Sequence, residues 1–227
     1  MAVVYNSPKF PIIDGIVLAL DSANSKSRSG GAAWRDLFGN IKFIGYRSPQ
    51  FNTTFKTIHL DGSSEYYEND SGWTSFGTDS FSIVIWFRAH GYGSNTTLIG
   101  TNNTGAGTFD ISFNGSNQIR FRSQVTGSTN DTTMVSSTDQ NVFYQLVFVR
   151  EGTGTNQFKI YRNGSLDTTG TVGTDLNSTN QLRIGRSRNG TNYYDGDLGI
   201  ILIHKGKAFN ATEVEQNYNL FRERYGI

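Results

Sequence analysis

FSIVIWFRAH, residues 81–90, is the stretch that decides the class of fold. Apolar side chains occupy every second position from Phe81 to Phe87, and Val84 and Trp86 lie between them. Successive side chains of a strand point to opposite faces of its sheet. A strand that is apolar on both faces needs cover on both sides, so these residues predict a central strand of a layered β-protein.

Shorter segments on both sides of this stretch also predict strands. They combine apolar, β-branched and aromatic residues and are separated by turn-forming residues. Residues 157–167 predict a hairpin, because Asn163 and Gly164 at its tip can both adopt the positive φ angles of a type I′ turn. The other predicted strands are residues 15–20, 57–62, 109–113, 118–123, 142–151, 181–185 and 196–206.

The C-terminal segment, residues 210–227, predicts a helix. Thr212 and Glu215 have the spacing of a capping box, and Gly226 suits a helix end. The apolar residues that recur at helical spacing are Val214, Tyr218, Phe221 and Tyr225. We expect this short amphipathic helix to pack back on the β-body.

The domain organisation follows from where the prolines lie. Pro8 and Pro11 predict an extended N-terminal arm over residues 1–13, because proline fixes φ and removes a backbone donor. No linker composition or internal repeat follows residue 14. A chain of 227 residues is long enough for one large all-β domain, so we expect residues 14–227 to form one.

Composition excludes several classes of function. The chain has 20 basic and 19 acidic residues, so it lacks the basic surplus of a nucleic-acid-binding protein. It has no cysteine, hence no disulfide or thiolate metal site. No apolar run is long enough to span a membrane, and the N-terminus lacks the pattern of a signal peptide. We therefore expect synthesis in a reducing cytosol.

The carboxylates do not form the pattern of a glycoside hydrolase, which needs two of them across a glycosidic bond. Asp195 and Asp197 alternate, but the glycine between them predicts a bend. Glu65, Glu68 and Asp70 do not fall on one strand face. No serine occupies a G-x-S-x-G elbow. We expect the protein not to be an enzyme.

Metal binding is predicted only for calcium. The three histidines, His59, His90 and His204, lie in or beside predicted strands without metal-ligand spacing, so we expect structural or surface roles for them. Calcium takes oxygen ligands, and Asp195 and Asp197 are the candidate pair. The alternative for this pair is a plain turn role. No other cofactor is expected.

Four aromatic residues in predicted loops are candidate glycan contacts, because sugar faces stack on aromatic rings: Trp73, Tyr92, Tyr193 and Tyr194. The alternative is that these rings pack onto the sandwich, since aromatic side chains bury large areas.

Several segments, taken in order, resemble the concanavalin A-like lectin/glucanase superfamily, in particular its laminin-G-like and pentraxin-like jelly rolls. They are residues 57–67, 81–90, 142–166 and 182–219. The signature positions within them are Asp61, Gly62, Trp86, Asn163 and Gly164. The resemblance implies an all-β, two-sheet antiparallel jelly-roll sandwich with a short C-terminal helix.

DGIVLALDSANSKSRSGGAAWRDLFGN, residues 14–40, resembles the lead-in of jelly-roll modules in tailed-phage structural proteins. The matching positions are Asp14, Asp21, Asn24, Trp34, Asp36, Leu37 and Asn40. A phosphate-binding loop would need a lysine after the glycine pair, and none is present. The resemblance implies instead that the glycines form a turn and that Trp34 anchors the core.

Family members bind glycans, decorate virions or mediate adhesion. The resemblance therefore implies a non-catalytic phage structural protein, made in the host cytoplasm and exposed on the virion as a head decoration or as a tail or fibre component. We expect a homo-oligomer, such as a trimer, that docks onto other virion proteins through its arm and contacts host glycans. The alternatives are a calcium-assisted carbohydrate-binding module and a glycoside hydrolase. No nucleic-acid or membrane partner is expected.

Overall fold

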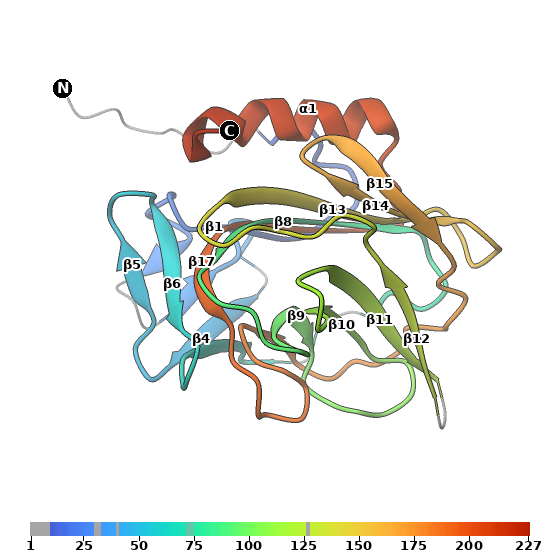
Figure 1. Ribbon diagram of the computed structural model, residues 1–227, viewed down its shortest axis with the longest axis horizontal. Coiled ribbons are helices and arrows are strands. Elements are labelled where there is room, and N and C mark those ends of the chain that lie inside the picture. Colours follow the sequence, from blue (N-terminus) through green and yellow to red (C-terminus); the bar gives the residue numbers. More distant parts are fainter. Residues whose placement is uncertain (1–9, 30–32, 40, 72, 74, 126–127) are drawn as a thin grey trace.

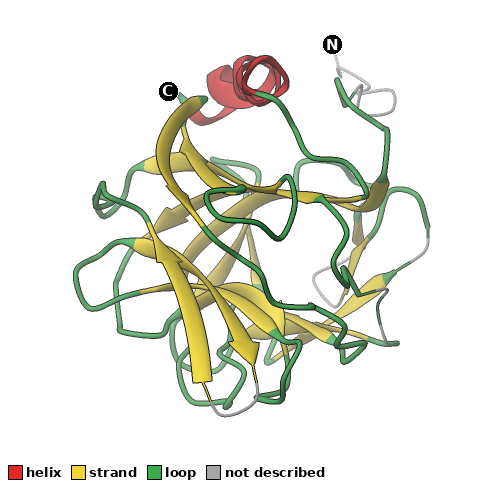
Figure 2. Ribbon diagram, turned by 90° about the vertical axis from the view of Figure 1, so that its right-hand side faces the viewer, coloured by secondary structure: helices red, strands yellow, loops and turns green. Residues whose placement is uncertain are grey.

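The computed structural model describes residues 10–227 except 30–32, 40, 72, 74 and 126–127. Two antiparallel sheets stack face to face, and the C-terminal helix lies on the outer face of one of them (Figures 1 and 2). No helix in the described part of the chain is long and apolar enough to cross a membrane. The predicted jelly-roll sandwich is confirmed.

The first sheet, called sheet A, contains residues 81–89, which the sequence predicts as a central strand. Its strands, in spatial order, are β15 (Ser165–Gly170), β14 (Phe158–Arg162), β13 (Phe143–Arg150), β8 (Phe81–Ala89), β17 (Asp195–Lys205), β6 (Thr57–Asp61) and β5 (Gln50–Asn52). Strand β1 (Ile16–Asp21) pairs with the later part of β17. The central place of β8, between β13 and β17, confirms the prediction from its two apolar faces.

The second sheet, called sheet B, carries the more polar outer face. Its strands, in spatial order, are β12 (Ser128–Thr133), β11 (Ile119–Val125), β10 (Phe109–Phe113), β9 (Thr97–Thr101), β16 (Leu182–Ile184), β7 (Tyr66–Asn69), β4 (Lys42–Tyr46), β3 (Ala33–Arg35) and β2 (Arg28–Ser29).

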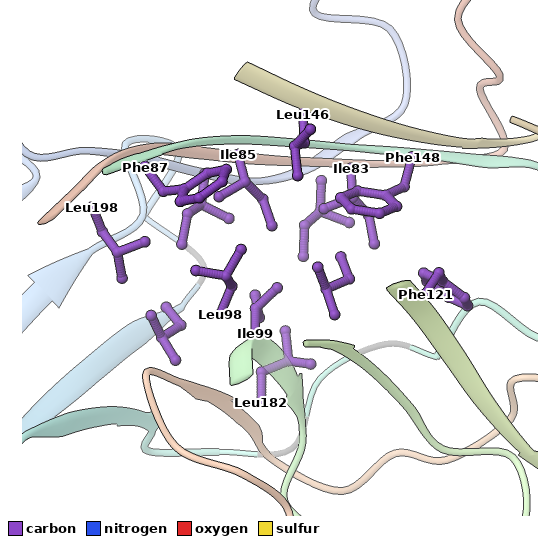
Figure 3. Close-up of a cluster of buried hydrophobic side chains, with 14 of the residues drawn as sticks. Ile83, Ile85, Phe87, Leu98, Ile99, Phe121, Leu146, Phe148, Leu182 and Leu198 are labelled. Carbon is purple, nitrogen blue, oxygen red and sulfur yellow. The ribbon is translucent and has the colours of Figure 1, made fainter. Parts of the chain in front are cut away.

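The main core fills the space between the sheets. Ile83, Ile85 and Phe87 of β8 point toward Leu98 of β9 and Leu182 of β16 (Figure 3). The other face of β8 is covered as well, because Val84 and Trp86 pack in a second cluster beneath the helix. Each large apolar side chain buried in this way contributes about 1.5–3 kcal/mol.

The helix α1 (Ala211–Phe221) begins two residues earlier than the sequence predicted. Asn210, not Thr212, is the N-cap: its side chain accepts a hydrogen bond from the Glu213 N–H at 2.9 Å, and Glu213 accepts one from the Asn210 N–H at 2.9 Å. Asparagine is at least as favourable as threonine at an N-cap position. The pair Asn210 and Glu213 therefore competes with the pair Thr212 and Glu215 to form the capping box. A short 3₁₀ helix (Arg222–Tyr225) follows, and Gly226 ends it with φ of 72°, as predicted.

The signature residues have structural roles. Trp34 is fully buried, which confirms the predicted core anchor. Asp36 accepts a hydrogen bond from the Ala19 N–H at 2.8 Å. Asn163 and Gly164 have φ of 49° and 81°, as a type I′ turn requires. The glycine pair of the lead-in lies outside the described residues.

The predicted N-terminal arm is only partly described, because residues 1–9 lie outside the described part. From Phe10 onward the chain packs against its own domain, so these residues are not free to dock onto a neighbour. Phe10 and Ile12 are buried in the cluster beneath the helix, and the Phe10 ring lies 6.2 Å from that of Phe221. Their apolar side chains gain more from this burial than an exposed arm would allow.

Candidate functional site

A pocket of about 310 Å³ opens between loops at one end of the sandwich. Its walls come from the turn after β6, the loop after β8 and the loop that leads into β17. The lining residues are Gly62, Gly91, Tyr92, Gly93, Thr96, Thr191, Asn192, Tyr193 and Asp195. Three of the residues singled out in the sequence, Tyr92, Tyr193 and Asp195, therefore come together in one pocket.

Two glycines make room for Asp195 in this pocket. A Cβ at Gly62 would lie 2.7 Å from the Cβ of Asp195, and φ of Gly62 is 69°, a value that favours glycine. A Cβ at Gly91 would lie 3.3 Å from Oδ2 of Asp195. A side chain at position 62 would therefore displace Asp195, whereas one at position 91 would only crowd its carboxylate. The Asp195 side chain keeps 44% exposure.

Asp61 fixes the turn that forms one rim of the pocket. Its Oδ1 accepts hydrogen bonds from the backbone N–H groups of Ser63, Ser64 and Glu65 at 2.8–2.9 Å. Burial would raise the pKa of Asp61, but the Ser63 hydroxyl and these N–H groups outweigh it and hold the pKa well below the usual 3.8. Asp61 is therefore a structural residue of the turn.

Tyr92 is held firmly in the pocket wall. Its hydroxyl donates a hydrogen bond to the Thr138 carbonyl at 2.8 Å, and its ring lies 5.0 Å from that of Phe113. Burial raises the pKa of its phenol. The ring is only partly exposed, so Tyr92 shapes the pocket and presents part of one face.

Tyr193 connects the pocket to a row of aromatic rings on the outer face of sheet B. Tyr46 and Tyr66 are partners in the register of β4 and β7, and their rings stack with centroids 4.4 Å apart and planes 2° apart. Tyr66 lies 6.2 Å from Tyr193. We call these three residues the tyrosine ladder. The Arg186 guanidinium lies 4.7 Å from the Tyr66 ring centroid and 5.1 Å from that of Tyr193.

Tyr46 and Tyr66 were not among the site residues predicted from the sequence. The segment YYEN alternates, with Tyr67 and Asn69 buried, and this pattern marks Tyr66 as a residue of the opposite face. Its pairing with Tyr46 depends on strand register, which has no signal in the sequence.

Two predicted glycan contacts are wrong. Trp73 is 4% exposed, and its ring packs 4.7 Å from that of Phe76 in the main core. Tyr194 is fully buried, and burial raises the pKa of its phenol well above the usual value. Consecutive residues in extended chain point to opposite sides, so Tyr193 faces outward and Tyr194 inward.

The side chains of the predicted calcium pair, Asp195 and Asp197, lie in different environments. Asp195 faces the pocket, whereas the Asp197 side chain is fully buried. The imidazole of His90 lies between them, with Nδ1 3.7 Å from Asp195 Oδ1 and Nε2 3.0 Å from Asp197 Oδ2. The Arg88 guanidinium contacts Asp197 Oδ2 at 2.6 and 2.9 Å. The two carboxylates therefore do not face a common cation, as calcium would require.

The structure instead gathers His59, His90 and Asp197. One ligand atom from each lies within 4.8 Å of the other two. His204, by contrast, is fully buried, and its Nδ1 lies 2.8 Å from the Asp14 carbonyl oxygen. His204 thus has the structural role that was expected of the histidines. His59 and His90, together with Asp197, form a group of residues that could hold a metal.

A family model described as the concanavalin A-like lectin/glucanases superfamily matches residues 61–215. This match covers more than half of the chain, so the chain belongs to that superfamily. A comparison with curated protein sequences finds no match.

Solved structures share the fold at low sequence identity. Domain 4 of AbnA, a GH43 extracellular arabinanase from Geobacillus stearothermophilus, in complex with arabinotriose, has a TM-score of 0.69 at 16% identity, over 89% of this chain and 98% of that one. The receptor binding domain of botulinum neurotoxin type G has a TM-score of 0.70 at 21% identity, over 91% and 51%. The binding domain of botulinum neurotoxin DC in complex with SialylT gives 0.67 at 19%, also over 91% and 51%. The chain thus spans about half the length of the neurotoxin domains.

Proposed function

We propose that the protein is a non-catalytic carbohydrate-binding domain whose ligand site is the pocket together with the tyrosine ladder. The observation that carries this proposal is the position of Tyr193, which lines the pocket and also ends the ladder. A sugar ring stacks on an aromatic face while its hydroxyls bond to polar groups, and this site offers both at one place. The binding modules among the similar structures support the same class of function.

The charge of the pocket favours neutral sugars. Among the described lining residues, Asp195 carries the only charge, and the other polar groups are amides, hydroxyls and backbone. A carboxylate accepts hydrogen bonds from sugar hydroxyls and repels sialic acid and sulfate. The Arg186 guanidinium lies outside the pocket, beside Tyr66 and Tyr193 of the ladder. We therefore expect glycans that place a neutral sugar in the pocket to bind more tightly than glycans of the same size that place an anionic sugar there.

A glycan array followed by titration calorimetry tests the proposal. Tyr193→Ala and Tyr46→Ala should each weaken binding of the strongest neutral ligand roughly tenfold, or about 1.4 kcal/mol. Leu166→Ala is the control, because Leu166 is 52% exposed on β15 and lies outside the site. Unchanged affinity in Tyr193→Ala would reject the site.

The non-catalytic part of the proposal has a separate test. Glycoside hydrolysis needs a second carboxyl group beside Asp195, and the pocket lining described here offers none. Incubation of the bound glycan with the protein should release no new reducing ends. Release that disappears in Asp195→Asn would show catalysis instead.

The resemblance of residues 14–40 to tailed-phage modules extends the proposal to a location. On that proposal the domain presents its glycan site from a virion surface, as an oligomeric head decoration or as a tail or fibre component. Mass spectrometry of separated heads and tails from particles of the source tests it. Presence in one fraction identifies the position, and absence from both rejects the virion assignment while leaving glycan binding to its own test.

A further inference from the structure

Three adjacent strands bring His59, Asp197 and Arg88 side by side. Asp197 of β17 is the register partner of His59 on β6 and of Arg88 on β8. His90 follows Arg88 by two residues, so it points to the same face of sheet A. The side chains of His59 and His90 are 33% and 26% exposed, whereas the side chain of Asp197 beneath them is fully buried. The result is a buried anion under two imidazoles that solvent can reach.

We propose that His59, His90 and Asp197 bind a divalent transition-metal cation of the zinc class. His90 Nε2 lies 3.0 Å from Asp197 Oδ2, and His59 Nδ1 lies 3.8 Å from Asp197 Oδ1. Ligand atoms at about 2.1 Å from a tetrahedral Zn²⁺ lie about 3.4 Å apart. One ligand atom from each of the three residues already lies within 4.8 Å of the other two, so the side chains have to close this distance on the cation. The exposed side of the imidazoles leaves the fourth position to water.

The groups around the three ligands already fix their orientation. Arg88 holds Asp197 Oδ2, and the Thr57 hydroxyl donates to Asp197 Oδ1 at 3.1 Å. The Asn52 amide also donates to Asp197 Oδ1 at 3.3 Å, so both carboxylate oxygens have two donors besides His90. A cation would therefore take the place on Oδ2 that the His90 Nε2–H group holds. His90 Nδ1 lies 3.7 Å from Asp195 Oδ1. A metal-bound histidine usually donates its other N–H to a carboxylate, and Asp195 occupies that place.

Cation binding needs one proton to change position. In the cation-free protein, the His90 Nε2–H group donates to Asp197. With a cation on Nε2, the neutral imidazole carries its proton on Nδ1, opposite Asp195. When His90 is neutral at the start, this step only moves its proton from Nε2 to Nδ1, and no redox partner is involved.

The ligand types select the cation. Two imidazole nitrogens and one carboxylate suit Zn²⁺, Co²⁺ or Ni²⁺, whereas Ca²⁺ and Mg²⁺ take oxygen ligands. The chain has three histidines and no cysteine, and His204 is fully buried. His59 and His90 are therefore the two accessible imidazoles. Zinc bound through imidazole can be assigned to them by substituting each in turn.

Titration calorimetry of the untagged, chelator-treated full chain with ZnCl₂ is the experiment. One saturable site per chain is expected, and CaCl₂ should give no comparable heat. His59→Gln and His90→Gln should each lose saturable binding, and Asp195→Asn should weaken it by about 10–100-fold. Asp131→Asn is the matched control, because Asp131 pairs with Arg122 on sheet B. Its zinc affinity should equal that of the wild type.

Two outcomes overturn the proposal: no saturable zinc binding by the wild type, or equal binding by both histidine variants. Circular dichroism verifies that the variants fold.

If the histidine variants do not fold, CoCl₂ added to the wild type gives a readout without mutation, because tetrahedral Co²⁺ absorbs strongly in the visible range and octahedral Co²⁺ does not. An octahedral spectrum would also reject the site. Neither histidine lines the sugar pocket, so His59→Gln should keep glycan affinity, and the two proposals can fail separately.

Discussion

At the scale of single residues, burial decides roles that residue type leaves open. Arg150 shows this most clearly, because its side chain is fully buried in a sandwich whose other arginines are more exposed. It donates to the carbonyl oxygens of Gly77, Asp79 and Thr174 at 2.7–3.0 Å. Burial lowers its pKa to about 10, yet it remains charged at neutral pH. Arg150 therefore ties two loops to the end of β13.

Arg150→Met should destabilise the domain by about 3–5 kcal/mol, because it leaves buried carbonyl groups without donors. Urea unfolding followed by tryptophan fluorescence measures the change. Arg162→Met is the control, since Arg162 is less buried and its single carbonyl contact, to Ser137, is exposed. Similar losses in both variants would contradict the special role of Arg150.

His204 predicts a pH dependence of stability. Burial lowers its pKa below the usual 6.5, and the nearby Lys207 acts in the same direction. The Asp14 carbonyl and Glu213 oppose this shift without cancelling it. The unfolded chain therefore binds a proton more readily than the folded one, and stability falls as pH decreases through about 6.5.

Chemical denaturation at pH 7.5 and 5.5 measures this dependence. The wild type should lose stability at the lower pH, and His204→Gln should lose less, although it is less stable at pH 7.5. Equal pH dependence in the two proteins would rule out His204 as the source.

At the scale of elements, α1 depends on the Asn210 cap, whereas the sequence predicted Thr212 as the cap. Asn210→Ala removes the side-chain bond to the Glu213 N–H and should cost about 1 kcal/mol. Thr212→Ala is the matched comparison, because Thr212 was the cap expected from spacing and lies inside the first turn. Thermal unfolding of both variants measures the difference. A larger loss in Thr212→Ala would restore the capping box predicted from the sequence.

At the scale of the whole molecule, both ends of the described chain meet on the outer face of sheet A. Phe10 is 7% exposed and contacts Phe221, which lies at the end of α1. The helix in turn covers Trp86, whose ring lies 4.8 Å from that of Tyr225. This second cluster joins residues far apart in sequence, so the helix and the residues around Phe10 belong to the cooperative unit.

Phe10→Ala should destabilise the isolated domain by about 3 kcal/mol, because it leaves a cavity beside the helix. Ile13→Ala is the control, since Ile13 is 66% exposed. Guanidinium unfolding compares the two. A free arm that docks only onto a neighbour would predict no effect of Phe10→Ala on the monomer.

The sequence by itself determined a layered β-protein, its central strand β8, the turn at Asn163 and Gly164, and the C-terminal helix, while the jelly-roll sandwich was implied by the family resemblance. These features depend on alternation, helical spacing and turn chemistry, which act between residues close in the chain. It also identified three of the nine residues that line the pocket as candidate ligand residues, namely Tyr92, Tyr193 and Asp195. It could not separate Tyr193 from Tyr194, because both fall in one short loop and only packing decides which ring is buried.

Only the tertiary structure decided which distant residues meet. Tyr46 and Tyr66 stack because of the register of β4 and β7. His59, His90 and Asp197 converge because β6, β8 and β17 are neighbours in sheet A. The free energy of such pairings is shared over whole strands and the core between the sheets, so no short motif encodes them. Both proposed binding sites therefore depend on strand order and register, which fix where these side chains lie.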